Sequence, residues 1–186
     1  VEATIALHYV FDAPKDQIVF DVSHQSYVHK MLTGRIEAFI SPEHYNDITG
    51  YTSPDESEYD LFEIGHTSTS IALAAGLAKA RDIEGGKQHV IAVIGDGAMS
   101  GGEAFEGLDL GATFKSGFIV VVNDNQMSIA ENHGGIYENL ALLRETNGQA
   151  LLNMFKALGY DYLYIKDGND IESLVKGFES VRGTDH

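Results

Sequence analysis

The sequence predicts an α/β fold, with an open, mostly parallel sheet and helices on both faces. Two short segments, residues 89–94 and 117–122, are apolar at nearly every position, as expected of strands buried on both faces. A third apolar segment, residues 17–22, follows Pro14 and predicts another strand. Helical patterns lie between these segments, and strands that alternate with helices form parallel βαβ units.

The other elements follow along the chain. Residues 33–60 are polar and rich in turn-forming residues, which predicts one long loop. Residues 162–165 have a strand-like composition. Apolar residues at helical spacing predict helices over residues 1–11, 27–32, 67–83, 100–110, 147–158 and 171–181.

The composition limits the possible functions. The chain has 186 residues, of which 28 are acidic and 12 basic, and its formal net charge is −16. Such a charge repels nucleic acid and anionic membranes. The chain contains no cysteine, which excludes thiol nucleophiles, disulfides and cysteine-ligated metal sites. No apolar run approaches the ~18 residues of a membrane span, so we expect a soluble, cytoplasmic domain.

The two ends of the chain lack the usual boundary signals. Residues 1–11 begin as a helix with no N-cap residue before Val1, and the chain stops at His186 after a helical pattern. We therefore expect residues 1–186 to form a single domain that is a piece of a longer multidomain chain. Frayed natural termini are the alternative.

A glycine-rich segment follows the strand predicted at residues 89–94. It runs Gly95-Asp96-Gly97-Ala98 and leads into a helix. Glycines let the backbone approach a ligand closely and present N–H groups to phosphate. An aspartate between two glycines binds a hard cation with little steric obstruction. Taken alone, the same residues are equally typical of a tight strand-to-helix turn.

A second polar segment, Asn123-Asp124-Asn125, follows the strand predicted at residues 117–122. Because parallel strands end at the same edge of a sheet, we expect this segment to lie beside Asp96. The Asn125 side-chain oxygen and the Met127 backbone carbonyl, together with Asp96 and two diphosphate oxygens, make an oxygen-rich shell suited to Mg²⁺. An Asx-type turn is the alternative.

Four motifs, in order and at compatible spacing, resemble the 1-deoxy-D-xylulose-5-phosphate synthase family of the transketolase superfamily. They are DVSHQSYVHKMLTGR at 21–35, SEYD at 57–60 with GHTSTS at 65–70, GDGAMSGGEAFE at 95–106, and NDNQMSI at 123–129. The resemblance runs from residue 1 to about residue 135 and continues weakly to residue 181. It implies the thiamine-diphosphate-binding fold, with thiamine diphosphate and Mg²⁺ as cofactors.

The resemblance also implies which residues surround the diphosphate. Asp96 and Asn125 would bind Mg²⁺, with the Met127 backbone carbonyl as a third ligand, so Asn125 would also serve the cofactor. Gly97 and Ala98 would lie against the diphosphate.

Two histidine-containing loops would complete this site. Gly65, His66 and Thr67 would line the cofactor, and His24 would lie near the diphosphate or the substrate as the catalytic candidate. Taken alone, either histidine is as consistent with a structural role, its ring hydrogen-bonded to the backbone.

Other charged residues of the motifs have alternative roles. Lys30 would add positive charge near the site, whereas solvated surface is the expectation for His29 and Arg35. The acidic residues that we expect on a solvated face of the loop are Glu56, Glu58 and Asp60.

The chain departs from the family pattern at several positions. Ser23 stands where the family has glycine, and Val28 where it has proline. Only residues 137–149 precede the next predicted helix, where the family has a long segment. We therefore expect a shorter subfamily, or a chain that has lost a piece.

By this resemblance the protein is a thiamine-diphosphate-dependent transferase. It would condense pyruvate with glyceraldehyde 3-phosphate to 1-deoxy-D-xylulose 5-phosphate with loss of CO₂, for isoprenoid precursor and thiamine biosynthesis. This chain would supply the cofactor anchor. The catalytic glutamate of a pyrimidine-binding domain and an upstream histidine loop would lie outside it, so the isolated chain should be inactive. We also expect a homodimer.

Two alternative functions remain open at this point. Another transketolase-type enzyme is consistent with the shortened segment, and a non-catalytic cofactor-binding paralogue is consistent with the missing parts. A generic phosphate-binding protein is disfavoured, because the chain has neither a G-x-G-x-x-G fingerprint nor a P-loop lysine.

Overall fold

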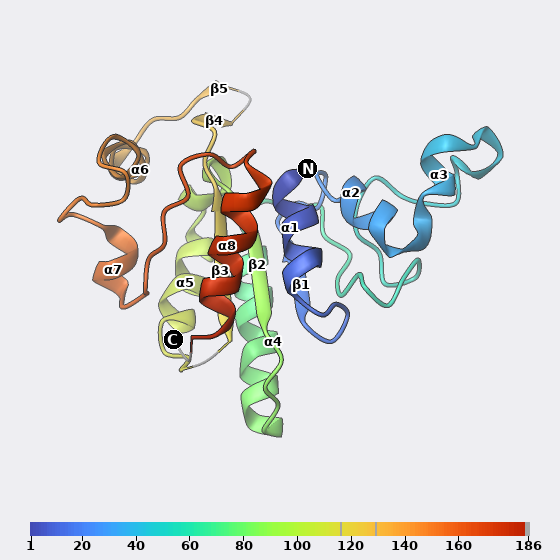
Figure 1. Ribbon diagram of the computed structural model, residues 1–186, viewed down its shortest axis with the longest axis horizontal. Coiled ribbons are helices and arrows are strands. Elements are labelled where there is room, and N and C mark those ends of the chain that lie inside the picture. Colours follow the sequence, from blue (N-terminus) through green and yellow to red (C-terminus); the bar gives the residue numbers. More distant parts are fainter. Residues whose placement is uncertain (116, 129, 185–186) are drawn as a thin grey trace.

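The computed structural model describes residues 1–115, 117–128 and 130–184. Within these residues, three parallel strands form a sheet in the order β1-β2-β3, namely β1 (Gln17–Phe20), β2 (Val90–Gly95) and β3 (Phe118–Asn123). The central strand β2 pairs with β1 on one side and with β3 on the other (Figure 1). The predicted α/β class and its three main strands are confirmed.

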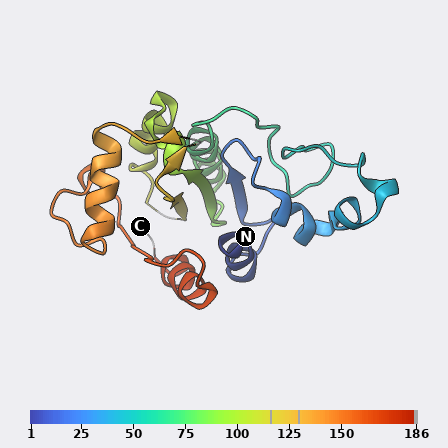
Figure 2. The same cartoon turned by 90° about the horizontal axis from the view of Figure 1, so that it is seen from above.

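Helices cover both faces of this sheet, as predicted. The helices α4 (Ser70–Glu84) and α5 (Gly102–Gly111) lie on one face, and α1 (Glu2–Val10) and α8 (Ile171–Arg182) lie on the other (Figure 2). Alternate side chains of β2 point into the two layers, which explains why the strand is apolar throughout. The side chains of β2 that join the α4 and α5 layer are Val90, Ala92 and Ile94, and those that join the α1 and α8 layer are Ile91 and Val93.

Small residues allow α4 and α5 to pack closely. A Cβ atom added to Gly107 of α5 would come within 2.6 Å of the Ala72 backbone nitrogen of α4. Helix α4 begins at Ser70, later than predicted, because Ser68 has a left-handed backbone with φ of 72°. The end of α4 is set by Gly85, which adopts the left-handed conformation at the C-cap.

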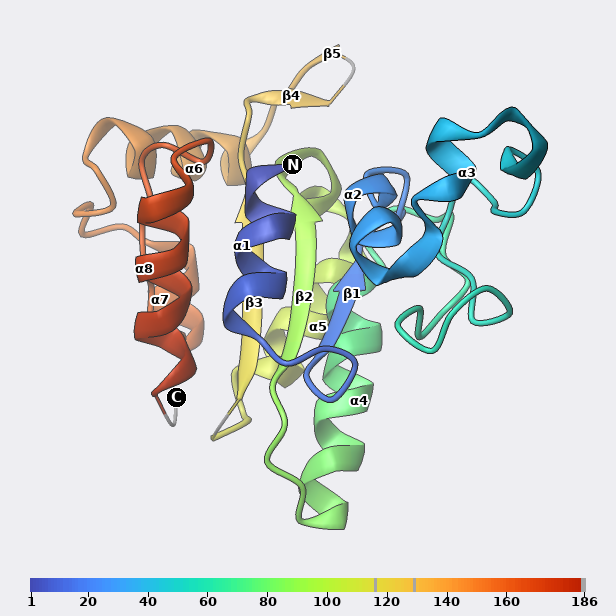
Figure 3. The same cartoon turned by 45° about the vertical axis from the view of Figure 1, so that its right-hand side comes forward.

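The region predicted as one long loop is partly helical, so that prediction was incomplete. The helix predicted over residues 27–32 is confirmed as the short helix α2 (Tyr27–Lys30). It continues into the turn η1 (Met31–Arg35), which kinks at Thr33 and Gly34, and α3 (Glu37–Ile40) and the 3-10 turn η2 (Pro42–His44) follow. These short elements, seen at the right of Figure 3, extend away from the sheet. The elements η1, α3 and η2 are at most five residues long, so the sequence pattern has too little periodicity to reveal them.

Two predictions near the C-terminus were wrong. The helix predicted over residues 147–158 is limited to α7 (Met154–Leu158), and a helix that was not predicted, α6 (Gly135–Glu145), precedes it. Asn147 and Gly148 both have positive φ, which ends one helix before the other begins.

Residues 162–165 form no strand, contrary to the prediction. A cavity of about 880 Å³ lies between this segment and β3. The segment packs through its aromatic side chains instead, since the Tyr162 ring stacks on Phe155 with centroids 5.6 Å apart.

Among the described residues, no helix combines the length and the apolar character that crossing a membrane requires.

A buried ionic network holds residues 49–60 against α2 and η1. The Asp60 carboxylate accepts hydrogen bonds from the Arg35 guanidinium at 2.6 and 2.9 Å, and it lies 2.9 Å from His29 Nε2. The Glu56 carboxylate accepts from Arg35 at 3.1 Å and pairs with the Lys30 ammonium.

This network corrects the expectation that His29, Arg35, Glu56 and Asp60 are solvated. The side chains of His29 and Asp60 are almost fully buried, and those of Arg35 and Glu56 are about 10% and 9% exposed. Only Glu58 of the expected surface group is exposed. Burial of these charges is tolerated because each finds an opposite charge and hydrogen-bonding partners, which come from segments distant in sequence.

The network controls the protonation of two groups. Burial alone would raise the pKa of Asp60, but the hydrogen bonds from His29 and Arg35 outweigh it and hold that pKa well below its usual value. His8 of α1 extends the network, because its Nε2 lies 2.9 Å from His29 Nδ1. Burial, together with the charge of His29, lowers the pKa of His8 to about 4.

We predict that this histidine contact makes stability depend on pH. The unfolded chain takes up a proton on His8 near its ordinary pKa of 6.5, whereas the folded chain does so only near pH 4, so stability falls as the pH falls from 6.5 to 4. His8→Gln removes this proton uptake. Thermal midpoints of the protein that carries this chain, measured at pH 8 and pH 5, should therefore fall less for the variant. The difference at pH 8 controls for packing, and equal falls would contradict the prediction.

We also predict that Asp60→Asn destabilises the protein by about 3–5 kcal/mol, because it leaves Arg35 and Lys30 with one buried carboxylate between them. The matched control is Glu58→Gln, which changes an exposed acid two residues away and should shift the unfolding free energy by about 0.5 kcal/mol or less. Urea denaturation of both variants measures the difference. Similar midpoints for the two would show that the network adds no stability.

Candidate functional site

The ends of β2 and β3 lie side by side. Gly95 and Asn123 are partners in the register of the two strands, so the segments that follow them start next to one another. After β2 comes the 3-10 turn η3 (Asp96–Ser100), and after β3 comes a hairpin of β4 (Met127–Ser128) and β5 (Ala130–Glu131). Figure 1 shows the hairpin beyond this edge of the sheet. The sequence expectation that these polar segments meet is therefore fulfilled.

Asp96 is a buried acid at this edge, with 3% of its surface exposed. Burial and the nearby Asp124 carboxylate raise the pKa of Asp96, while hydrogen bonds from the Gly97 and Gln126 backbone N–H groups oppose that rise. Asn132 Nδ2 also donates to the Asp96 carboxylate at 2.9 Å. The site therefore holds two carboxylates close together in a partly desolvated position.

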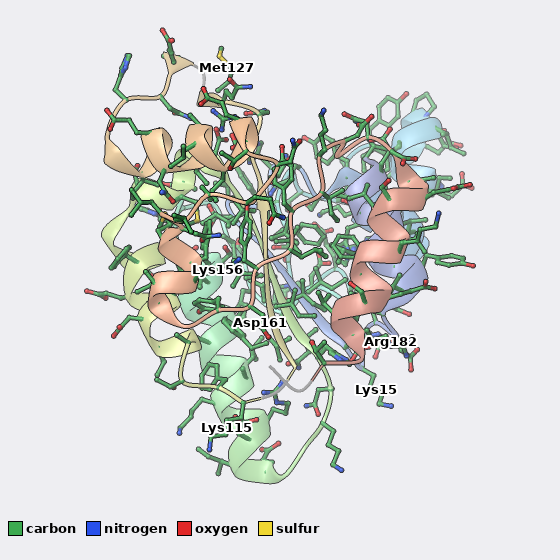
Figure 4. The ribbon with its side chains drawn as sticks, turned by 60° about the vertical axis from the view of Figure 1, so that its left-hand side comes forward. Lys15, Lys115, Met127, Lys156, Asp161 and Arg182 are labelled. Atoms are coloured by element: carbon green, nitrogen blue, oxygen red, sulfur yellow. The ribbon has the colours of Figure 1, made fainter. Side chains whose placement is uncertain are left out.

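Asn125 and Met127 lie in the turn that contacts Asp96, and both are exposed. The Asn125 side-chain oxygen accepts a hydrogen bond from the Met127 backbone N–H at 3.1 Å, as in an Asx-type turn. Figure 4 shows the Met127 side chain at the outer end of the hairpin. Ile129, the last residue of this motif, lies outside the described residues.

The atoms at this edge that could bind a metal ion are carboxylate, amide and backbone carbonyl oxygens. In the part of the chain that the structure describes, no group of three or more His, Asp or Glu side chains is arranged to hold a metal ion. A cation at this edge would therefore depend on amide and backbone oxygens in addition to Asp96, which is the donor set that the sequence predicts.

The glycine-rich turn η3 is held from two sides. The Tyr137 hydroxyl of α6 donates to the Gly97 carbonyl oxygen at 3.1 Å, and the Ser68 hydroxyl donates to the Ala98 carbonyl oxygen at 2.7 Å. A Cβ atom added to Gly101 would lie 2.1 Å from the Ser68 hydroxyl oxygen. The turn is thus fixed in place, while Gly97 and Ala98 stay half-buried.

The two histidine loops lie at the same edge. Gly65, His66 and Thr67 are exposed just before α4, and His24 is exposed in the turn after β1. The His66 ring is 2.7 Å from the Thr67 carbonyl oxygen, which matches the alternative of a histidine bonded to the backbone. The structure therefore brings His24, residues 65–67 and η3 to one edge of the sheet.

Ser23 adopts a backbone conformation that is unusual for serine. Its φ is 66°, in the left-handed region that favours glycine. The Ser23 hydroxyl donates to the Ile64 carbonyl oxygen at 2.8 Å and accepts from the Thr52 backbone N–H at 2.9 Å. These two hydrogen bonds offset the backbone strain and join the His24 turn to the segment before Gly65.

Positive charge is not gathered at this edge in the way the sequence suggested. His29, Lys30 and Arg35 are held by the buried network, so they do not supply charge to η3. In Figure 4, Lys15, Lys115 and Arg182 lie at the end of the molecule opposite Met127.

Several residues at this edge were not found by sequence reasoning. Tyr137 and Arg144 belong to α6, which was not predicted, and Arg144 pairs with Asp124. Asp21 and Ser68 belong to the recognised motifs, but nothing in their spacing indicates that they bond to each other. Asp21 could have been identified from the sequence, because it is a polar residue that immediately follows a buried strand.

Comparison with known proteins shows which family this chain is similar to. The family model described as 1-deoxy-D-xylulose-5-phosphate synthase matches residues 1–152. The chain is 56% identical over 144 residues to the synthase of that name from Symbiobacterium thermophilum. This aligned region covers 77% of this chain and 22% of that protein. It is 45% identical over 183 residues to the Brevibacillus brevis synthase, which covers 98% of this chain and 27% of that protein.

A third relative carries residues that this chain lacks. The chain is 39% identical to 1-deoxy-D-xylulose-5-phosphate synthase 1 from Geobacter sulfurreducens, over 100% of this chain and 35% of that protein. That alignment extends over 221 residues, more than the 186 of this chain, so the relative contains additional residues within the aligned region. The chain spans between about a fifth and a third of the length of these three relatives. With its fold, its four motifs and these matches taken together, the chain belongs to the 1-deoxy-D-xylulose-5-phosphate synthase family.

Proposed function

We propose that this chain is the N-terminal part of a longer enzyme that condenses pyruvate with glyceraldehyde 3-phosphate to 1-deoxy-D-xylulose 5-phosphate and CO₂. In this proposal the chain holds the diphosphate of thiamine diphosphate through Mg²⁺. The observation that carries the proposal is the meeting of Asp96, the turn at residues 124–127 and the loop at residues 65–67 at one edge of a parallel sheet, in a member of this family. Ligands of such sheets bind at this edge.

The residues at this edge fit the proposed group. The Asp96 carboxylate, the Asn125 amide oxygen and the Met127 carbonyl are hard oxygen donors, which Mg²⁺ prefers. A Cβ atom added to Gly95 would meet no atom within 4 Å, so there is open space beside the backbone where a diphosphate would approach.

The charge of the chain supports a divalent cation at this position. The chain carries a formal charge of −16, and at the proposed site Asp96 lies close to Asp124, whose one ion pair in the described residues is with Arg144. A diphosphate placed here without a cation would be repelled by both carboxylates. A bound Mg²⁺ removes that repulsion and attracts the diphosphate oxygens.

The chain's own residues have distinct roles in this proposal. Gly97 and Ala98, held by Tyr137 and Ser68, present backbone to the diphosphate and keep it in one orientation. His24 has an exposed ring at the same edge, where it would hold a proton near a diphosphate or substrate oxygen. Thiamine diphosphate, when bound, supplies the carbanion chemistry that transfers the two-carbon unit of pyruvate to the aldehyde.

The remaining parts of the active site come from outside the chain in this proposal. His24, residues 65–67 and Asn125 are all exposed, so a second domain can cover this edge and exclude water. We propose that a pyrimidine-binding domain with the activating glutamate does so, in a homodimer in the cytoplasm. The chain without that domain would be inactive.

Asp96→Asn tests the proposed function. In the full-length protein, calorimetric titration with thiamine diphosphate should show Mg²⁺-dependent binding, and the variant should bind the cofactor at least about 10-fold more weakly, because the charged ligand is lost. The matched control is Glu106→Gln, which changes an exposed acid on α5 and should leave the affinity unchanged. When pyruvate and glyceraldehyde 3-phosphate are both supplied, the wild-type protein should release CO₂. Mg²⁺-independent binding, or equal affinities of the two variants, would refute the proposed anchor.

A further inference from the structure

Asp21 occupies a singular position at the end of β1. Its side chain is buried, with 2% of the residue exposed, and its two carboxylate oxygens accept hydrogen bonds from backbone N–H groups. One oxygen accepts from Ser68 at 2.9 Å and the other from Ser70 at 3.0 Å. A carboxylate that accepts two backbone N–H groups in a buried position makes strong, directional contacts. Asp21 therefore fastens the start of α4 to the end of β1.

This contact continues to the glycine-rich turn. Ser68, which Asp21 holds through its N–H, uses its hydroxyl to donate to the Ala98 carbonyl oxygen at 2.7 Å. The close approach of Gly101 to the Ser68 side chain leaves no room for the serine to shift toward η3. A continuous chain of hydrogen bonds thus runs from Asp21, just after β1, through Ser68, just before α4, to Ala98 of η3.

Asp21 also stabilises the strained turn that carries His24. Val22 and Ser23 have φ of 56° and 66°, and a left-handed backbone is especially unfavourable for the β-branched valine. Such conformations persist only where the surroundings enforce them. The Asp21 carbonyl accepts from the Gln25 side-chain Nε2 at 3.0 Å, and the Asp21 carboxylate accepts from the Ser70 N–H of α4 at 3.0 Å, so Asp21 is held at both its backbone and its side chain where the turn begins.

We propose that Asp21 is a positioning residue for the cofactor site. By fixing β1, the start of α4 and η3 to one another, it sets the spacing of His24, residues 65–67 and Gly97 and Ala98. The inference rests on the proposed function, because that spacing matters only if one ligand contacts all three segments. Asp21 itself lies beneath them and acts through them.

The chain offers a matched control at the opposite end of β1. Asp16 is 5% exposed, and its carboxylate accepts from the backbone N–H groups of Asp12 at 2.9 Å and His89 at 2.8 Å. It therefore fastens β1 to its neighbours through two backbone N–H groups, as Asp21 does, and it also lies 3.1 Å from the His89 ring nitrogen Nδ1. Its neighbour Lys15 lies at the end of the molecule opposite Met127 in Figure 4, so the Asp16 contacts are remote from the proposed site.

The experiment compares Asp21→Asn with Asp16→Asn in the full-length protein at saturating Mg²⁺. In each variant one carboxylate oxygen, which accepts a hydrogen bond from a backbone N–H, is replaced by an NH₂ group, which cannot accept it. Both variants should therefore have lower thermal midpoints. Only Asp21→Asn should weaken thiamine diphosphate binding, by about 10-fold or more, with Asp16→Asn within about 2-fold of the wild type. Hydrogen exchange without cofactor should show faster exchange at residues 22–26 and 65–70 in Asp21→Asn alone.

The possible outcomes separate this inference from the proposed function. If Asp21→Asn fails to fold, Ser68→Ala removes only the bond to Ala98 and should weaken cofactor binding relative to Asp16→Asn. If the variants at Asp21 and Ser68 bind the cofactor as Asp16→Asn does, the positioning role is overturned and the proposed function stands. If the wild-type protein does not bind thiamine diphosphate, the proposed function fails, and the positioning role fails with it as a role in that site.

Discussion

The parallel pairing of β2 with β3 is the constraint on which the rest of the structure depends. It places Gly95 beside Asn123, and so places Asp96 beside the turn at residues 124–127. The pairing is possible because β2 is apolar on both faces and is covered by α4 and α5 on one side and by α1 and α8 on the other. A shift of one residue would exchange the side chains that β2 directs into its two helical layers, so the packing of those layers also fixes the position of the site.

The strongly acidic composition has two structural consequences. In the loop region, Lys30 and Arg35 neutralise Glu56 and Asp60 in a buried network, which fixes residues 49–60 beneath the segment that leads to Gly65. At the strand ends, Asp96 and Asp124 stay close together, with Arg144 paired to one of them. Lys30 and Arg35 therefore stabilise the scaffold, whereas at the edge of the sheet Arg144 offsets only one of the two carboxylates, and the remaining negative charge suits a divalent cation.

Sequence reasoning was most successful where periodicity or motif chemistry was strong. The buried strands, the long helices α4, α5 and α8, and the meeting of Asp96 with the turn after β3 were all predicted. The helix at residues 27–32 was predicted, but the short elements that follow it up to residue 44 were missed because a single helical turn carries almost no periodic signal. Helix α6 and the segment at residues 162–165 were misjudged because local propensity does not reveal which segments pack against β3.

The sequence by itself determined the α/β class, the family and the residue types available at the strand ends, because these depend on local pattern and composition. The tertiary structure decided which of those residues are anchors. The bonds from Asp21 to Ser68 and Ser70, the burial of Asp60 with Arg35, and the left-handed turn at Ser23 each join segments far apart in the chain. Such contacts form only when the sheet and its helical layers have assembled, because the local sequence around a residue does not indicate which distant residue it will contact.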